Sequence, residues 1–421
     1  MLVYTLALAL VLVVGGSFGL YFLMALWPKP VVAHPHRRPG LYVFFVPALN
    51  EELVIANTIE SLLALPAGRT RIVVIDDASD DDTAQIVNGY DDPRVTLLQR
   101  RLPDARQGKG AALNHAYHRL LDEIGDIPAR DVVVGVVDSD GRLTRGAIEV
   151  MDGLFSDRGV GAVQTLVRII NRSSLLGRFQ DYEFVAFGSL TQAAREKIGS
   201  VGLGGNGQFT RLSALQDLGP EPWSDCLTED LDLGIRLAIA GWGNRYTKDA
   251  WVEQQGLTDI RRLTRQRTRW CQGHFQCWRL MRPLISSDLP TRSVLDFLFY
   301  LLTPALTLLG SVVFVAPFFL LLISLIVTPA RASWQLYVIY LVLLYLVSFG
   351  PSLLLGAWYW RQAKDISISH AFVLSHGLAA YNLIWYVAEW RALARIAFRR
   401  NSWAKTARLP ESPEADGSAA T

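Results

Sequence analysis

Cysteine is scarce in this chain, which has only Cys226, Cys271 and Cys277 among its 421 residues. An odd count without the spacing of metal ligands argues against a disulfide framework or a zinc site, and it fits a reducing cytosolic environment. Net charge is also nearly absent, at +2. Because nucleic-acid-binding domains are usually strongly basic, the composition predicts no nucleic-acid partner.

Charged residues are missing from a long N-terminal run. Leu2 to Trp27 contains none, and about 20 apolar residues are enough to span a bilayer. The alternative is a cleaved signal peptide, but that would carry its basic residues before a shorter apolar core, whereas Lys29, Arg37 and Arg38 follow this run. We therefore predict an N-terminal transmembrane anchor over residues 1–28, with the next segment in the cytosol.

Charge is sparse again in three C-terminal blocks, which run from Val294 to Val327, Trp334 to Trp360 and Ile366 to Trp390. Aromatic residues cluster at the ends of these blocks, as they do at membrane interfaces. We predict C-terminal transmembrane helices within residues 294–390. The tail that follows, residues 391–421, is basic at first and then polar, and we expect its end to be disordered in the cytosol.

The number of C-terminal crossings stays open. Three crossings that start in the cytosol would leave the basic tail outside, against the positive-inside tendency. Either the first block breaks at Pro304 and Pro317 into an interfacial piece and a span, or the last block is partly interfacial.

Between the apolar ends, residues 37–260 alternate short apolar runs with stretches of helical periodicity. The runs are 41–46, 71–75, 95–98 and 132–137, and the helical stretches are 51–65, 83–89 and 109–124. Fully apolar runs of this length are typical of parallel strands that are buried on both faces. Their order predicts a doubly wound α/β sheet, with ligands at the carboxyl ends of the strands.

Acidic residues follow two of these predicted strands. Asp138 and Asp140 come after the last one, and two carboxylates at this spacing can converge on a hard divalent cation, although Asp-Ser-Asp-Gly is also a good turn sequence. Asp76 and Asp77 begin a segment with five acids in eight residues. This exceeds what a helix cap needs, so we predict a functional role for Asp76 and Asp77 and a capping role for Asp81 and Asp82.

Two helix starts carry polar residues of less specific meaning. Lys109 lies between two glycines before a helical stretch, where an anion could dock, but the surrounding residues do not match a Walker motif. Thr228 precedes Glu229 and Asp230 at the start of a helical run, and by themselves these residues, with Asp232, indicate a capped helix.

An arginine-rich segment precedes the C-terminal apolar blocks. Residues 261–282 contain seven arginines and no acid. We predict amphipathic interface helices over residues 261–293, and one interpretation is a helix lying on anionic headgroups. Gln266, Arg269 and Trp270 share one helical face, which indicates a more specific role: pairing with a pyrophosphate, hydrogen bonding and stacking on a sugar.

Six motifs occur together and in order. They are VPALNEE at 46–52, DDAS at 76–79, GKGAALN at 108–114, DSD at 138–140, TED at 228–230 and QRTRW at 266–270. Over about residues 40–285, this series resembles the processive family 2 glycosyltransferases, a group that includes cellulose, hyaluronan, chitin and poly-N-acetylglucosamine synthases.

The resemblance implies a GT-A fold, a doubly wound mixed α/β sheet flanked by transmembrane helices, which binds a UDP-sugar with Mg2+ or Mn2+. The residues implied to bind the nucleotide-sugar are Pro47, Asn50, Glu51, Asp76, Asp77, Lys109 and Asp138. Asp138 and Asp140 would hold the metal, and Asp230 would be the general base. The residues implied on the acceptor and diphosphate side are Asn206, Glu229, Gln266, Arg269 and Trp270.

The expected activity is inverting transfer from a UDP-sugar to a growing β-linked polysaccharide, coupled to membrane translocation. Asn206-Gly207 stands where hyaluronan and chitin synthases have a cysteine-rich loop, so those two products are not expected. Non-processive transfer of one sugar to a lipid or lipid-linked acceptor is the alternative, and an inactive membrane scaffold or export subunit is a third reading. In the first two readings the partners are the donor, a carbohydrate or lipid-linked acceptor and membrane lipids. The enzyme would be multi-pass in the cell membrane, with its catalytic domain in the cytosol.

Overall fold

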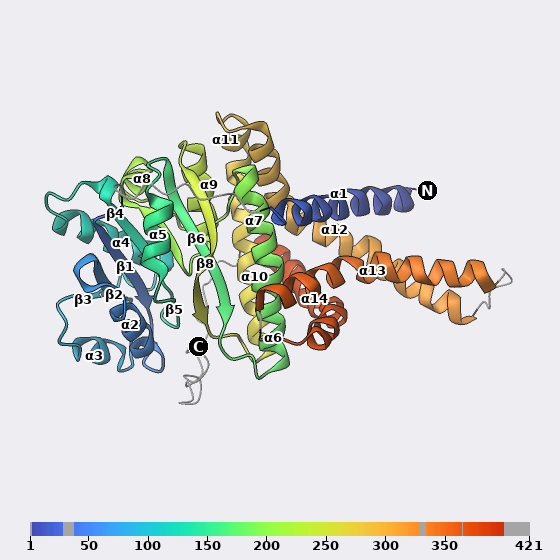
Figure 1. The fold of residues 1–421 in the computed structure, drawn as a ribbon, viewed down its shortest axis with the longest axis horizontal. Coiled ribbons are helices and arrows are strands. Elements are labelled where there is room, and N and C mark those ends of the chain that lie inside the picture. Colours follow the sequence, from blue (N-terminus) through green and yellow to red (C-terminus); the bar gives the residue numbers. More distant parts are fainter. Residues whose placement is uncertain (1, 28–37, 328–333, 364, 400–421) are drawn as a thin grey trace.

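The computed structural model describes residues 2–27, 38–327, 334–363 and 365–399 (Figure 1). Its centre is an eight-stranded mixed sheet with the strand order β3-β2-β1-β4-β7-β6-β8-β5. The strands are β1 Leu41–Ala48, β2 Thr70–Asp76, β3 Val95–Gln99, β4 Val132–Val136, β5 Arg142–Leu143, β6 Val160–Ile169, β7 Gln208–Arg211 and β8 Gly243–Gln254. The four predicted runs are strands β1 to β4, and they pair in parallel as expected.

Both faces of this parallel part are covered, which confirms the predicted doubly wound arrangement. On one face, Phe44 and Val46 of β1 share a core with helices α2 (Ile55–Leu63), α3 (Thr83–Asn88) and α5 (Ala147–Phe155). On the other face, Val43 and Phe45 pack with the opposite helices. These are α4 (Lys109–Glu123), α8 (Leu212–Asp217) and α9 (Glu229–Ile239). Since neighbouring residues of a strand point to opposite faces, an uninterrupted apolar run satisfies both cores.

The sheet changes direction between β4 and β7, and this change brings the candidate site together. Strand β7 is antiparallel to β4, and its first residue, Gln208, pairs with Val136 at the end of β4. The segment before β7 therefore meets the segment after β4 at one edge of the sheet. Asp138 and Asp140 lie in one of these segments, and Gly205 and Asn206 lie in the other.

Further helices lie beyond β6 and β8. They are α6 (Leu175–Tyr182), the π-helix η4 (Glu183–Gly188), α7 (Ser189–Ile198), α10 (Ile260–Gln276) and α11 (Met281–Ile285). Short 3-10 helices are η2 (Ala67–Arg69), η3 (Ala129–Asp131) and η5 (Cys277–Leu280). In Figure 1, α7 and α10 stand beside β6 and β8, and the apolar helices project from their far side.

The apolar ends of the chain form long helices: α1 (Leu2–Ala25), α12 (Thr291–Val327), α13 (Trp334–Ala363) and α14 (Ile368–Ala397). Helix α1 packs against α7 and α12, and α13 packs against α14 (Figure 1). Within the described residues, two helices are long and apolar enough to cross a membrane, Thr291–Val313 and Ile368–Ala397, and Leu12–Ala25 is a shorter apolar helix.

The prediction that the first C-terminal apolar block divides at its prolines is wrong. Helix α12 continues without a break through Pro304 and Pro317, so the first C-terminal block does not divide into two pieces. A proline removes one backbone hydrogen bond, and an apolar helix tolerates this loss where neighbouring groups compensate. The predicted disordered end of the tail lies outside the described residues.

Candidate active site

The two acids after β4 lie at the carboxyl edge of the sheet. Asp138 Oδ1 accepts a hydrogen bond from Lys109 Nζ at 2.6 Å, and its side chain is partly exposed. Asp140 is buried, and its Oδ2 accepts from the backbone N–H of Gln255 at 3.1 Å. Oxygen donors of this kind suit a hard divalent cation. Within the described residues no group of three or more His, Cys, Asp or Glu side chains could hold a metal, so a bound cation would also need diphosphate or water oxygens.

Glu229 and Asp230 begin α9 and face the same lysine. Glu229 Oε1 lies 3.9 Å from Lys109 Nζ. Gly205 has a φ of +78°, and a Cβ on it would stand 2.8 Å from Asp230 Oδ2 and 3.3 Å from Lys109 Nζ. Lys109 is therefore a cation shared by Asp138, Glu229 and Asp230. The glycine segment, residues 202–207, lies close over Asp230 and Lys109 at Gly205.

The electrostatics of this cluster follow from its burial. Burial raises the pKa of Asp230, and Lys109 and Arg269 oppose this shift. Burial and the charge of Asp230 raise the pKa of Glu229 to about 7. Burial alone would lower the pKa of Lys109, but Asp138 and Glu229 outweigh it, so that pKa is raised. Asp230 is consequently a stronger base than an exposed aspartate, beside a firmly protonated lysine.

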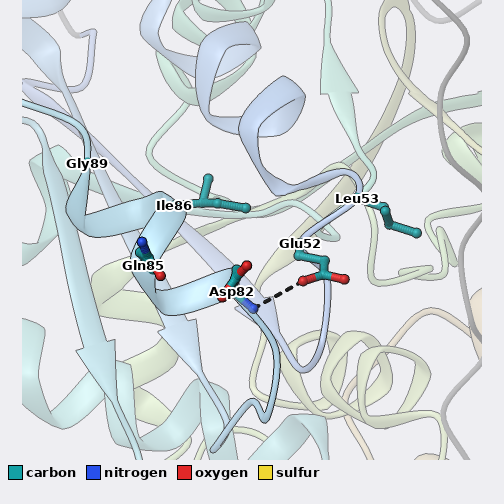
Figure 2. A pocket seen from close by; sticks show the side chains of 6 residues that line it. All are labelled: Glu52, Leu53, Asp82, Gln85, Ile86 and Gly89. Carbon is teal, nitrogen blue, oxygen red and sulfur yellow. Dashed lines mark hydrogen bonds between the residues drawn. The ribbon is translucent and has the colours of Figure 1, made fainter.

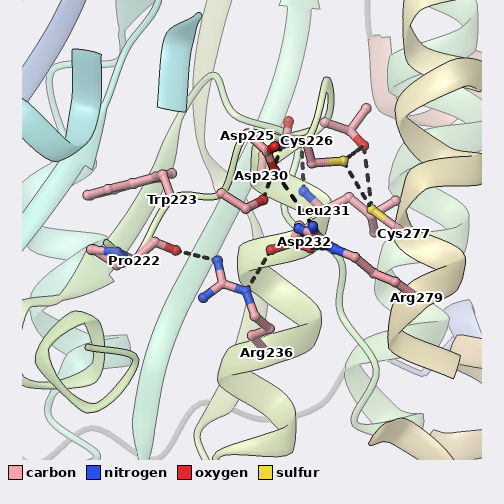
Figure 3. A network of polar contacts seen from close by, with 12 residues as sticks. Pro222, Trp223, Asp225, Cys226, Asp230, Leu231, Asp232, Arg236, Cys277 and Arg279 are labelled. Carbon is pink, nitrogen blue, oxygen red and sulfur yellow. Dashed lines mark hydrogen bonds and ion pairs between the residues drawn. The ribbon is translucent and has the colours of Figure 1, made fainter. Parts of the chain in front are cut away.

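An ion network centred on a buried carboxylate holds the start of α9 in place (Figure 3). Asp232 is fully buried and accepts from Arg236 Nε at 2.6 Å and from Arg279 Nη2 at 2.8 Å. The backbone N–H of Leu231 donates to Asp230 Oδ1 at 2.7 Å and orients that carboxylate. Asp232 lies with Glu229 and Asp230 in the first turn of α9, as predicted, although its side chain also bridges two arginines. Thr228 occupies the N-cap position but makes no side-chain cap, so that part of the prediction is wrong.

The cysteines are free thiols, as predicted. Cys226 and Cys277 lie beside this network with their sulfurs 3.6 Å apart (Figure 3). All three cysteines are buried: Cys226 and Cys277 pack the segment before α9 against η5, and Cys271 of α10 packs against Ala388 and Ala392 of α14.

The loops after β1 and β2 are tied together at the predicted nucleotide side. Asn50 adopts a left-handed φ of +53°, accepts from the backbone N–H of Asp80 at 2.7 Å and donates its own N–H to Ser79 Oγ at 2.9 Å. The backbone N–H of Glu51 donates to Thr83 Oγ1 at 2.8 Å. These contacts fix the position of Pro47, which precedes them at the end of β1.

The acids of this region divide by role. Asp76 is buried and accepts from the backbone N–H of Ser79 at 3.0 Å. Asp77 forms a buried ion pair with Arg100, a partner that the sequence did not indicate. Asp81 accepts from the backbone N–H of Thr83 at 3.0 Å and so caps α3 as predicted, whereas Asp82 at the N-cap position makes no such bond and that part of the prediction is wrong.

An open pocket of about 480 Å3 lies against α3, and its lining does not include Asp138, Glu229 or Asp230 (Figure 2). It is lined by Glu52, Leu53, Asp82, Gln85, Ile86 and Gly89. None of these was a predicted ligand-binding residue, and the pocket neighbours the loop of Asn50 and Glu51 without including them.

Helix α10 places Arg269 near the carboxylates at the start of α9, while the contacts of Gln266 and Trp270 are with other residues. The charge of Arg269 lowers the pKa of Glu229 and of Asp230 against the larger effect of burial. Gln266 Oε1 accepts from Arg267 Nη1 at 2.9 Å. The Trp270 ring lies 6.4 Å from the rings of Phe184 and Trp385.

Arg267 is the anchor of α10 that the sequence did not reveal. It is 1% exposed, pairs with Glu183 Oε2 at 2.8 Å and stacks on Trp270 at 4.0 Å. Helix α10 packs one face against α14, and its interpretation as a helix lying on headgroups stays a prediction.

Asn206, predicted on the acceptor side, is buried beside the loop of Asp138 and Asp140. Its Oδ1 accepts from the backbone N–H of Asp138 at 3.0 Å. The structure thus brings Lys109, Asp138, Glu229 and Asp230 together, with Arg269 close enough to act on them electrostatically. Asn206 instead orients the segment that carries Asp138.

Residues 39–273, more than half of the chain, match the family model described as "Glycosyltransferase like family 2". The chain belongs to glycosyltransferase family 2. A relative of this transferase, the β-monoglucosyldiacylglycerol synthase of Trichormus variabilis, is 32% identical over 270 residues, which cover 61% of this chain and 54% of the relative. The poly-β-1,6-N-acetyl-D-glucosamine synthase of Staphylococcus epidermidis is 26% identical over 279 residues, 65% of this chain and 64% of that one. The transferase therefore matches less than two thirds of the length of either relative.

The fold of the transferase is also shared with a solved structure. The mannosyltransferase PcManGT from Pyrobaculum calidifontis, in complex with GDP-Man and Mn2+, has a TM-score of 0.59 at 20% identity. That match covers 91% of this chain and 99% of the other. It confirms the expected GT-A-like α/β fold.

Proposed function

We propose that this family 2 transferase moves a hexose or N-acetylhexosamine from a UDP-sugar to the hydroxyl of a lipid acceptor at a membrane surface, with inversion at the anomeric carbon. The observation that carries the proposal is the convergence of Lys109, Asp138 and Asp230 on one sheet edge, directly beside α10 and the first turns of α12. The donor would bind at the charged cluster of Lys109, Asp138 and Asp230, and the acceptor would approach from the side of the apolar helix α12.

Asp230 acts as the general base. Its carboxylate takes the proton of the acceptor hydroxyl while the acceptor oxygen bonds to the anomeric carbon and the bond from that carbon to UDP breaks. One displacement from the opposite face turns an α-linked donor into a β-linked product. Positioned general bases contribute roughly 10²–10⁴-fold to such rates.

Positive groups receive the leaving diphosphate. Lys109 and Arg269 both act electrostatically on the buried acids, so they stand where negative charge develops. A divalent cation held by Asp138 and Asp140 would neutralise part of that charge when bound. The loop of Asn50 and Glu51, tied to the loop of Asp76 and Asp77, would hold the nucleoside.

The acceptor side supports a lipid. Tyr300, in the first turns of the apolar helix α12, lies 3.5 Å from a Cβ placed on Gly202, three residues before Gly205, which covers Asp230. A hydroxyl on a membrane lipid at this boundary would be within reach of the base. The relative at 32% identity is named for a glucosyldiacylglycerol product, which agrees with this reading.

We propose the corresponding location: a cell-membrane protein whose α1 and C-terminal apolar helices lie in the bilayer and whose catalytic domain is cytosolic. Mean hydropathy and length of α12 and α14 support it.

A growing polysaccharide is the second candidate acceptor. It is favoured by the 26% identity to a polymer synthase and by the partly exposed Trp270, whose flat ring can stack on a sugar. The test is to incubate detergent-purified protein with UDP-glucose, UDP-N-acetylglucosamine or GDP-mannose, Mn2+ and vesicles that contain diacylglycerol. A lipid with one added sugar supports the proposal. A water-soluble polymer favours the second candidate, and a product that Asp230→Asn still makes at the wild-type rate favours an inactive scaffold contaminated by another enzyme.

A further inference from the structure

The segment from Gly202 to Gly207 covers the catalytic acids, yet it has no regular secondary structure of its own. Two glutamine side chains, the partly buried Gln192 and the buried Gln164, hold its backbone instead. Gln192 of α7 donates to Gly202 O at 2.7 Å and accepts from Gly202 N at 3.2 Å. Gln164 of β6 accepts from Gly204 N at 2.8 Å and donates to Asn206 O at 2.8 Å. Each glutamine therefore replaces the strand partner that this backbone lacks.

A third amide extends the chain of contacts to the metal-site loop. Asn206 Nδ2 donates to Gln254 Oε1 at 2.8 Å, while its Oδ1 accepts from the backbone N–H of Asp138. The next residue, Gln255, donates its backbone N–H to Asp140 Oδ2. The end of β8 thus supports the backbone of Asp138 through Asn206, and the residue after β8 supports the carboxylate of Asp140 directly.

These hydrogen bonds hold the glycine segment in a place where it has no room to move toward Asp230. A Cβ on Gly205 would already stand 2.8 Å from Asp230 Oδ2. A shift of about 1 Å in this segment would displace the base from its acceptor, and displacements of that size can cost roughly 10²-fold in rate.

We propose that Gln164, Gln192 and Gln254 are positioning residues of the transfer reaction: they fix the glycine segment over Asp230 and couple it through Asn206 to the DSD loop. This inference rests on the proposed function, since it assigns these amides to the placement of that base and that donor site. Nothing in the six sequence motifs includes any of the three glutamines.

Gln180 offers a matched control. It is 2% exposed, against 4% for Gln164, and it clamps a backbone in the same way, donating to Leu257 O at 2.8 Å and accepting from Leu257 N at 3.0 Å. Gln180→Leu and Gln164→Leu therefore remove the same kinds of hydrogen bond from equally buried sites. Of these two glutamines, Gln164 is the one that hydrogen-bonds the backbone of the glycine segment.

The experiment compares Gln164→Leu, Gln192→Leu, their double variant and Gln180→Leu in the full-length protein. We expect a loss of roughly 10- to 100-fold in kcat for each of the two single variants, with the KM for the UDP-sugar nearly unchanged. The double variant should lose less than the product of the single losses, because both glutamines hold one segment. Gln180→Leu should lower the Tm comparably and keep kcat within a few-fold.

A second measurement needs no turnover. Amide hydrogen exchange of the peptide that contains residues 200–207 should become faster in Gln164→Leu than in Gln180→Leu. If the wild type releases no UDP but this exchange difference is found, the proposed function fails and the network stands as a structural clamp. Equal exchange in the two variants, or equal loss of kcat in both, would overturn the positioning role.

Discussion

Replacing Gly205 with alanine tests the close fit over the catalytic acids. The new methyl group would stand 2.8 Å from Asp230 Oδ2 and 3.3 Å from Lys109 Nζ. Carbon–oxygen contacts this short do not persist, so either the carboxylate or the glycine segment must move. In addition, the φ of +78° is disfavoured for alanine by about 1–2 kcal/mol.

The two effects can be separated with a second glycine. Gly241, between α9 and β8, has a φ of +90° and no atom within 4 Å of the position of its Cβ. Gly241→Ala therefore introduces similar backbone strain without a contact. Both variants should unfold at a lower temperature than the wild type, by an amount that reflects the strain.

Only Gly205→Ala should lose activity beyond that shared effect. If Asp230 shifts by about 1 Å, kcat should fall roughly 10²-fold, while the KM for the UDP-sugar should change little because Asn50 and Asp76 are untouched. The assay is UDP release under saturating donor, beside a thermal melt of each variant. Equal kcat in the two alanine variants would refute the reasoning, since it would mean that the contact with Asp230 does not matter.

Three other predictions follow from the same geometry. The acid limb of the kcat profile should lie above the range of an ordinary aspartate, because the base must be ionised and its pKa is raised by burial; a limb at the ordinary aspartate value would contradict this. Arg267→Met should destabilise the protein by about 3–5 kcal/mol in a denaturant titration, because Glu183 loses its ion pair and keeps the hydrogen bond from Tyr381. Replacing the exposed Arg265 with methionine should not, and equal stabilities of the two variants would disprove the anchoring role of Arg267. Chelation of divalent cations with EDTA should abolish UDP release, and added Mn2+ should restore it. Asp140→Asn should raise the Mn2+ concentration needed for half-maximal activity. Activity that EDTA leaves unaffected would exclude a metal role for Asp138 and Asp140.

Much of the fold could be predicted because the responsible patterns are local. Strands β1 to β4 are largely apolar runs, and their observed bounds differ from the predicted ones by at most two residues. Asp138 follows such a run directly, so its place at the sheet edge was a consequence of the topology. The later strands β6 and β8 carry polar residues such as Gln164 and Lys248 among the apolar ones, and no simple alternation marked them.

The support of the site could not be predicted, because it consists of pairs that are distant along the chain. Asp232 pairs with Arg279, and Arg267 pairs with Glu183. A charged residue in a helix carries no local sign of which partner it meets or whether it is buried. Asp232 was therefore read as part of a cap, and Arg267 as one member of a basic surface.

Asp230 is proposed here as the base of a UDP-sugar-dependent transfer. The most direct test is UDP release by purified protein with its donor, Mn2+ and lipid acceptor, comparing wild type with Asp230→Asn and with Asp126→Asn, an exposed aspartate away from the site. We predict that Asp230→Asn loses roughly 10²–10⁴-fold in kcat and still binds UDP, while Asp126→Asn behaves as the wild type. Wild-type turnover by Asp230→Asn would contradict the account.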